Sequence, residues 1–313
     1  MQNFLLTAHA VVPMFLMIAA GYLCRRLGVL AREDVPRFNR VAFRVFLPCL
    51  LFYNVYTSDL SSAVRPKLIV FAVAGVLAVF VLSVLGVLLF VREPDRRGVI
   101  SQGIFRSNYV ILGLPIAQAL LEGQNLGPVA ILIAIVVPMF NFLAVTVLEV
   151  FRGGRVKAGT VLLEIAKNPL VVSSVLGIAC LLLRVKLPLT VEKAVSGLGN
   201  IATPLQLFLL GAFFRFEGLR RYRLPLTAVT AIKLFVTPAA ALSLAAALGF
   251  RGVEFVALIG VFASPTAVNS FTMVQQMECG DAELAGDIVI MTSAVSLFSF
   301  FLWIWIFKTM GVF

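Results

Sequence analysis

The amino-acid sequence predicts an all-α integral membrane protein, with ten transmembrane helices arranged as two inverted repeats of five helices. Three observations support this fold class: the composition, the spacing of the apolar segments and the positions of the prolines. Hydrophobic residues make up 61% of the 313 residues, and the mean hydropathy is +1.03. Soluble domains are only about 45–50% apolar. We therefore expect most of the chain to lie in a lipid bilayer.

The apolar segments set the number of helices. A helix needs about 20 mostly apolar residues to cross a bilayer, and ten such segments alternate with short stretches of charged residues, glycine or proline. We expect them at residues 4–24, 37–57, 68–91, 98–121, 127–150, 158–183, 191–214, 224–249, 252–277 and 285–308. The connections between them are too short to form a separate soluble domain.

The basic residues predict the orientation. Of the 26 lysines and arginines, fifteen lie in or beside the loops that follow odd-numbered segments, and seven lie on the opposite face. Because basic residues favour the cytoplasmic side, we expect both termini outside, in the periplasm, for a multi-pass protein of the cell inner membrane. This distribution also explains the net charge of +11 by topology, so the expected partner is the lipid bilayer and not nucleic acid.

Paired prolines indicate an internal repeat. Pro48 and Pro204 lie in the second and seventh segments, and Pro115 and Pro265 in the fourth and ninth, at separations of 156 and 150 residues. Five spans per half is an odd number, so the second copy must enter the membrane with opposite polarity. The predicted repeats are residues 1–156 and 157–313, and such inverted repeats are typical of transporters.

The prolines of the fourth and ninth segments predict two interrupted helices. Proline removes a backbone donor and crowds the preceding turn, so we expect breaks at Pro115 and Pro265. A half-helix that begins inside the membrane presents free N–H groups that suit a carboxylate. Asn108 precedes one break and Asn269 follows the other, and this pairing favours a binding site over two ordinary kinks.

Other polar residues inside the segments leave two interpretations open. Asn108, Asn141, Asn269 and Gln206 are costly in lipid, and either hydrogen bonds between helices or contacts with a ligand would account for them. We expect Arg106 and Lys233 to extend toward the cytoplasmic surface, and attraction of an anion is the alternative. No carboxylate lies near either break, which predicts transport without sodium or proton coupling. A single histidine and scattered cysteines predict no metal site and no cofactor.

Several motifs resemble one family of carriers. They occur in a characteristic order along nearly the whole chain, at residues 37–40, 46–49, 108–115, 167–169, 204–211, 233–238 and 264–265. In this respect the chain is similar to the auxin efflux carrier family, which includes plant PIN-type auxin exporters and bacterial permeases for malate or malonate. It resembles the bacterial PIN-like members, because residues 151–158 replace the long cytoplasmic loop of plant exporters.

The resemblance implies a scaffold of helices 1, 2, 6 and 7, and a mobile transport domain of helices 3–5 and 8–10. Crossed, broken helices 4 and 9 would hold the substrate, and the transport domain would move as an elevator. Assembly as a homodimer is a further possibility. Together, residue pattern and resemblance give a set of expected substrate-binding residues: Asn108, Gly113, Pro115, Asn141, Gln206, Pro265, Thr266 and Asn269.

The expected function is secondary transport of small organic anions, either auxin-like or malate-like and malonate-like carboxylates, without sodium coupling. The residues after Pro265 differ from those of plant exporters, which disfavours auxin itself. The alternative is a sodium-coupled organic-anion symporter of the bile-acid transporter type. A membrane enzyme is disfavoured, because the spans offer neither a nucleophile with its base nor a cluster of acids, and a receptor or channel ranks below the carrier.

Overall fold

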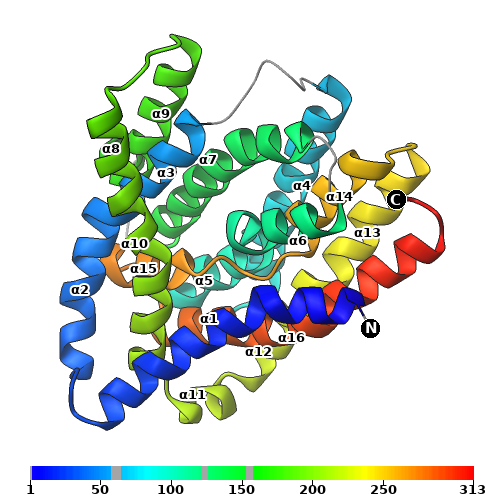
Figure 1. Cartoon of the computed structure of the whole chain (residues 1–313). Coiled ribbons are helices and arrows are strands. Elements are labelled where there is room, and N and C mark those ends of the chain that lie inside the picture. The colour runs from blue at the N-terminus through cyan, green and yellow to red at the C-terminus, as the bar shows by residue number, and fades with distance from the viewer. Residues whose placement is uncertain (1, 58–64, 122–125, 153–157) are drawn as a thin grey trace.

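The structure is a computed structural model, and it describes residues 2–57, 65–121, 126–152 and 158–313. Within these ranges every regular element is a helix (Figure 1). The first half contains α1 (Gln2–Arg26), η1 (Arg32–Asp34), α2 (Val35–Val41), η2 (Ala42–Phe46), α3 (Leu47–Tyr56), α4 (Pro66–Phe90), α5 (Pro94–Phe105), η3 (Tyr109–Gly113), α6 (Leu114–Leu120) and α7 (Gly127–Val150).

The second half follows after residue 157. It contains α8 (Ala158–Lys167), α9 (Pro169–Leu182), α10 (Leu189–Phe213), α11 (Phe216–Arg221), α12 (Arg223–Ala231), η4 (Ile232–Val236), α13 (Thr237–Ala247), α14 (Gly252–Ala263), α15 (Asn269–Met277) and α16 (Ala282–Thr309). Each of the ten expected apolar segments coincides with one of these helices or with two or three consecutive ones.

Five helical stretches of the described chain are long and apolar enough to cross a membrane on their own. They are α4, α7, α10, the continuous run α12–η4–α13, and α16. The most apolar of them is α4, and only 22% of its most apolar stretch is buried inside the protein. An apolar helix that leaves most of its surface uncovered is suited to contact lipid. The protein is therefore an all-helical, multi-pass membrane protein.

Three wide helical turns share one sequence signal. Each of η2, η3 and η4 ends two residues before a proline, namely Pro48, Pro115 and Pro238. At the end of η4, for example, the Thr237 amide bonds to the Ile232 carbonyl, five residues back instead of four. A wide turn of this kind absorbs the missing N–H and the bulk of the proline ring. The helix therefore passes each of these prolines without breaking.

The predicted break at Pro115 is wrong, and its physical reason is the wide turn η3. The chain leaves the helix earlier, over residues 106–108, and Pro115 lies exposed in the first turn of α6. The predicted break at Pro265 is confirmed. There α14 ends at Ala263, and α15 begins only at Asn269.

Glycines bring two pairs of helices into backbone contact. A Cβ atom added to Gly21 of α1 would lie 1.8 Å from the Phe208 carbonyl oxygen of α10, and one added to Gly211 would lie 1.8 Å from the Ile18 oxygen. Gly177 of α9 approaches Phe52 of α3 in a similar way. In Figure 1, α1 crosses α10, and α9 lies beside α3. These contacts make a frame to one side of the two interrupted helices.

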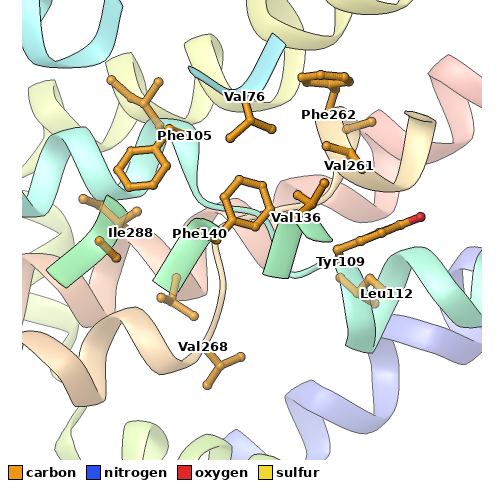
Figure 2. Packing of buried hydrophobic residues seen from close by; sticks show 14 of the residues in the cluster. Val76, Phe105, Tyr109, Leu112, Val136, Phe140, Val261, Phe262, Val268 and Ile288 are labelled. Carbon is orange, nitrogen blue, oxygen red and sulfur yellow. The ribbon is translucent and has the colours of Figure 1, made fainter. Parts of the chain in front are cut away.

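Large apolar side chains surround the interrupted helices on the other side. The Phe105 ring of α5 lies 5.1 Å from that of Phe80 and 6.4 Å from that of Phe140, between centroids. Figure 2 shows Phe105 and Phe140 from this group, with Val76 of α4 and Val261 of α14 in the same packed region. All but Phe80 are almost fully buried. The interrupted segments are therefore held inside the protein, away from lipid.

Candidate substrate site at the crossing of two broken helices

The two interruptions meet. The Asn108 amide, at the end of the first break, donates a hydrogen bond to the Pro265 carbonyl in the second, at 2.8 Å. Just beyond, a Cβ atom on Gly113 of η3 would lie 3.0 Å from the Gly260 Cα atom of α14. The predicted convergence of two broken helices is thus confirmed. Gly113 serves as a contact point between η3 and α14, and it does not line a cavity.

Each break satisfies backbone groups that the other exposes. Pro265 has no N–H, so the Val261 carbonyl loses its partner within α14, and the Ser107 hydroxyl donates to it at 2.5 Å. In return, the Thr266 hydroxyl donates to the Gly103 carbonyl near the end of α5, at 2.7 Å. Inside a bilayer such groups must be satisfied within the protein. The reciprocal bonds tie the two breaks into one unit.

Two cations lie buried at this crossing, against the expectation that both would reach the membrane surface. Arg106 is 2% exposed and Lys233 is 1% exposed. Arg106 donates to the Gln102 side-chain oxygen at 2.9 Å and to the Asn141 side-chain oxygen at 2.5 Å. The prediction was wrong because neighbouring elements supply acceptors within reach: Gln102 of α5 and Asn141 of α7 accept from Arg106, and Ser107 of the first break accepts from Lys233.

Neither cation has an acidic partner in the described part of the chain. The six ion pairs found there all involve other residues, and the buried acids Glu149 and Asp287 make no bond to either cation. A buried positive charge without a counter-ion is costly. The crossing therefore favours an anion.

A small cavity of about 80 Å³ opens beside the first break. Polar side chains from α3, α7, α10, the first break and the start of α15 line it, together with apolar side chains of α3, η3, α7 and the second break. The polar ones are Asn54, Arg106, Ser107, Asn108, Asn141, Thr203, Gln206 and Asn269. A water needs a space of roughly 10–15 Å³ for its centre, so this cavity is large enough for several waters or for a small carboxylate.

The cavity wall is rich in hydrogen-bond donors without acceptors. The side-chain NH₂ groups of Asn108, Asn141 and Gln206 are buried and have no partner. The orientation of Asn141 follows from its neighbour, because its oxygen accepts from Arg106 and its NH₂ group must then be the free end. Buried donors without acceptors are costly, and a carboxylate would satisfy several of them at once.

The start of α15 adds to this positive character. Ala267, Val268 and Asn269 line the cavity, and they form the last residues of the second break and the first of α15. No side chain caps this helix start. The Ser270 and Phe271 amides already bond to the Ala267 and Val268 carbonyls, but a helix N-terminus also carries a partial positive charge, which suits an anion in the same cavity.

The expected site residues fall into two groups. Asn108, Asn141, Gln206 and Asn269 line the cavity. The other four do not, and the structure gives each a different place: Gly113 packs against Gly260, Pro265 and Thr266 form the second break, and Pro115 is exposed. Sequence reasoning missed Arg106 as a site residue. Its position two residues before Asn108, with no acid nearby, was the available signal.

A second and larger space has a different character. A groove of about 950 Å³ lies between α4 on one side and α12 and α13 on the other, and apolar side chains line nearly all of it. None of the break residues lines it. Its size exceeds that of the central cavity, but it lacks the convergent polar groups that fix a small charged ligand. The chemistry therefore places the candidate site at the crossing.

Fold and site together define a helical membrane protein with a buried, anion-favouring site between two interrupted helices, as carriers have. The family model described as "Membrane transport protein" matches the chain twice, over residues 6–158 and 155–304. The chain therefore belongs to this family of membrane transporters, which is the auxin efflux carrier family that its motifs resemble.

Two relatives agree with this membership. The chain is 24% identical over 308 residues to a protein of Methanothermobacter thermautotrophicus named "Uncharacterized transporter", covering 96% of this chain and 98% of the relative. It is 26% identical over 291 residues to a protein of Rhizobium meliloti named "Putative malonate transporter", covering 90% of each. Both similarities extend over nearly the full chains, and both relatives carry transporter names.

Proposed function

We propose that this protein is a secondary transporter that carries small organic anions across the membrane, with dicarboxylates of the malonate or malate type as its preferred class. One observation carries the proposal: a residue with a buried guanidinium and three residues with unpartnered amide NH₂ groups line one small cavity. An anion with two carboxylates offers acceptors for these donors and a negative charge for the Arg106 guanidinium. The name of the Rhizobium meliloti relative supports the same class.

We assign the substrate contacts to Arg106, Asn108, Asn141, Gln206 and Asn269. Arg106 would bind one carboxylate, because its fork of donors matches carboxylate geometry. The amides of Asn108 and Asn141 would bond the remaining oxygens, and the first turn of α15 would bring Asn269 and the positive end of the helix dipole to the other end. Pro265 and Thr266 would act by keeping the second break open.

The pattern of helix contacts supports ten spans in two inverted repeats. If α5 with α6 is the fourth span and α14 with α15 the ninth, contacts between helices recur when the two repeats are exchanged. The contact of α4 with α5 corresponds to that of α13 with α14, and α1 with α10 corresponds to α9 with α3. The contact of α7 with α14 likewise corresponds to that of α16 with α5. An even number of spans also fits the two chain ends, which lie on the same side in Figure 1.

We further propose an elevator-type motion. The glycine contacts between α1 and α10 and between α3 and α9 suit a rigid scaffold, as the family resemblance implies. The reciprocal bonds between the breaks favour movement of both broken helices together, since separating them would expose the Val261 and Gly103 carbonyls. The basic loops would face the cytoplasm and the termini the periplasm, and a homodimer through the scaffold fits this arrangement.

Uptake into proteoliposomes tests the function. Purified protein should accumulate radiolabelled malonate or malate with saturable kinetics, and unlabelled dicarboxylates should compete better than monocarboxylates, including indole acids. The same flux should persist when choline replaces sodium. Absence of saturable uptake for every mono- and dicarboxylate, in either buffer, would refute the proposal. Single-channel currents would instead favour a channel.

A further inference from the structure

Lys233 is the buried cation that the substrate cavity does not use. Its side chain comes from the wide turn η4, and its ammonium donates to the Ser107 hydroxyl at 2.6 Å. That hydroxyl gives its own proton to the Val261 carbonyl, so toward Lys233 it can only accept. Lys233 does not line the cavity, whereas Ser107 and its neighbours Arg106 and Asn108 do. The ammonium therefore lies behind the cavity wall.

The surroundings of Lys233 are those of a cation site. Two half-helices, α5 and α14, end at this crossing, at Phe105 and Ala263. A helix C-terminus carries a partial negative charge on its last carbonyls. In carriers with inverted repeats, such C-terminal ends and unwound carbonyls are the groups that bind the coupling cation. The ammonium reaches this environment through Ser107, whose hydroxyl donates to the Val261 carbonyl.

We infer that the Lys233 ammonium is a tethered cation that takes the place of a dissolved coupling ion at the crossing. The inference rests on the proposed function and extends it. A carrier that relies on sodium must recruit the ion before the crossing can hold an anion. Here the Lys233 side chain supplies the positive charge. Its ammonium is held by Ser107, which lines the substrate cavity.

This arrangement has two consequences for transport. Substrate affinity in the wild type should not depend on sodium, because the cation site is filled by a covalently attached group. Removing that group should leave a gap beside Ser107 and the Val261 carbonyl, which a small dissolved cation could fill. Lys233 is thus a positioning residue, since it acts on the substrate through Ser107 and the first break.

The experiment compares Lys233→Gln with wild type and with Lys193→Gln, a change at an exposed lysine of α10. Malonate binding to the purified proteins is measured by titration calorimetry in choline, sodium and methylammonium buffers of equal ionic strength. We expect equal affinities in all three buffers for wild type and for Lys193→Gln. For Lys233→Gln we expect a loss of at least tenfold in choline, with several-fold recovery in sodium or methylammonium.

Three results would overturn the inference. Wild-type binding that requires sodium would do so, as would undiminished binding by Lys233→Gln in choline. So would a loss in Lys233→Gln that no small cation relieves. If Lys233→Gln does not fold, Lys233→Arg serves instead, and it should keep most of the affinity without sodium. Wild type that binds no carboxylate in any buffer would refute the proposed function itself, and this outcome is distinct from the others.

Discussion

The two broken helices meet at one point, yet they are built from different chemistry. The first break, residues 106–108, contains no proline and carries a buried guanidinium, a hydroxyl and an amide. The second break, residues 264–268, contains Pro265 and contributes mainly backbone and two hydroxyls, of Ser264 and Thr266. The comparison teaches that an inverted pair need not share its tasks equally. The first break supplies a buried positive charge, and the second supplies the interruption of α14 that brings α15 to the cavity.

The strongest test of this division is Arg106→Gln. The change removes the charge but keeps a polar side chain, and breaking a buried charge pair costs about 3–5 kcal/mol. We expect dicarboxylate uptake in proteoliposomes to fall by roughly a hundredfold or more. The matched control is Arg65→Gln, at an exposed arginine that pairs with Glu254, which should transport normally. Uptake by Arg106→Gln near the wild-type rate would mean that the Arg106 guanidinium does not bind the substrate carboxylate.

The second test addresses shape. Pro265→Ala restores an N–H that can bond to the Val261 carbonyl and so extend α14 through the break. We expect uptake to fall about tenfold, since roughly 1.4 kcal/mol of lost substrate stabilisation corresponds to that factor. Pro115→Ala is the matched change in the first broken helix and should have a much smaller effect, because η3 already carries the chain past it. Equal losses in the two variants would contradict the difference between the breaks.

The third test concerns the bond that joins the breaks. Ser107→Ala leaves the Val261 carbonyl and the Lys233 ammonium without their common partner, and an unsatisfied buried group costs about 1–3 kcal/mol. We expect a lower melting temperature in detergent and a moderate loss of uptake. Ser107→Thr keeps the hydroxyl and should restore much of both. A wild-type melting temperature for Ser107→Ala would mean that this hydroxyl does not hold the breaks together.

The smallest effect is expected far from both breaks. Gly86 lines the large apolar groove, and no atom lies within 4 Å of a Cβ atom built on it. Gly86→Leu should therefore leave dicarboxylate uptake within about twofold of wild type, a change below roughly 0.5 kcal/mol. A strong loss in this variant would indicate that the groove, and not the crossing, carries the substrate.

Sequence reasoning located the helices and the break at Pro265, because long apolar segments and proline act locally, whereas the crossing of two broken helices was expected from the paired repeats and the family resemblance. It misplaced the first break, since the effect of Pro115 depends on whether the preceding turn can widen, and no residue type signals that in advance. The four amide-bearing residues were found because their side chains are costly in lipid, and all four line one cavity. Whether they bind substrate stays a prediction.

The two cations show where local reasoning ends. Arg106 and Lys233 are long enough to reach water, and a span considered alone gives them no reason to turn inward. The acceptors that hold them, on Asn141 and Ser107, lie 35 and 126 positions away in the chain. Only the assembled crossing brings these groups together. The ten-span repeat, the orientation and the motion likewise depend on relations between elements, and they stay proposals.

The wide turn η4 has a consequence for how the chain tolerates change. One additional residue per turn rotates all preceding side chains by about 100° relative to those that follow. In a regular α-helix the Lys233 side chain would therefore point away from Ser107, and a different side chain would point toward it. Pro238, whose side chain has no hydrogen-bonding group, thus fixes the rotational position of Lys233 by favouring the wide turn before it. Deleting one residue between Lys233 and Pro238 would turn the ammonium away from Ser107, although every residue at the crossing would keep its identity.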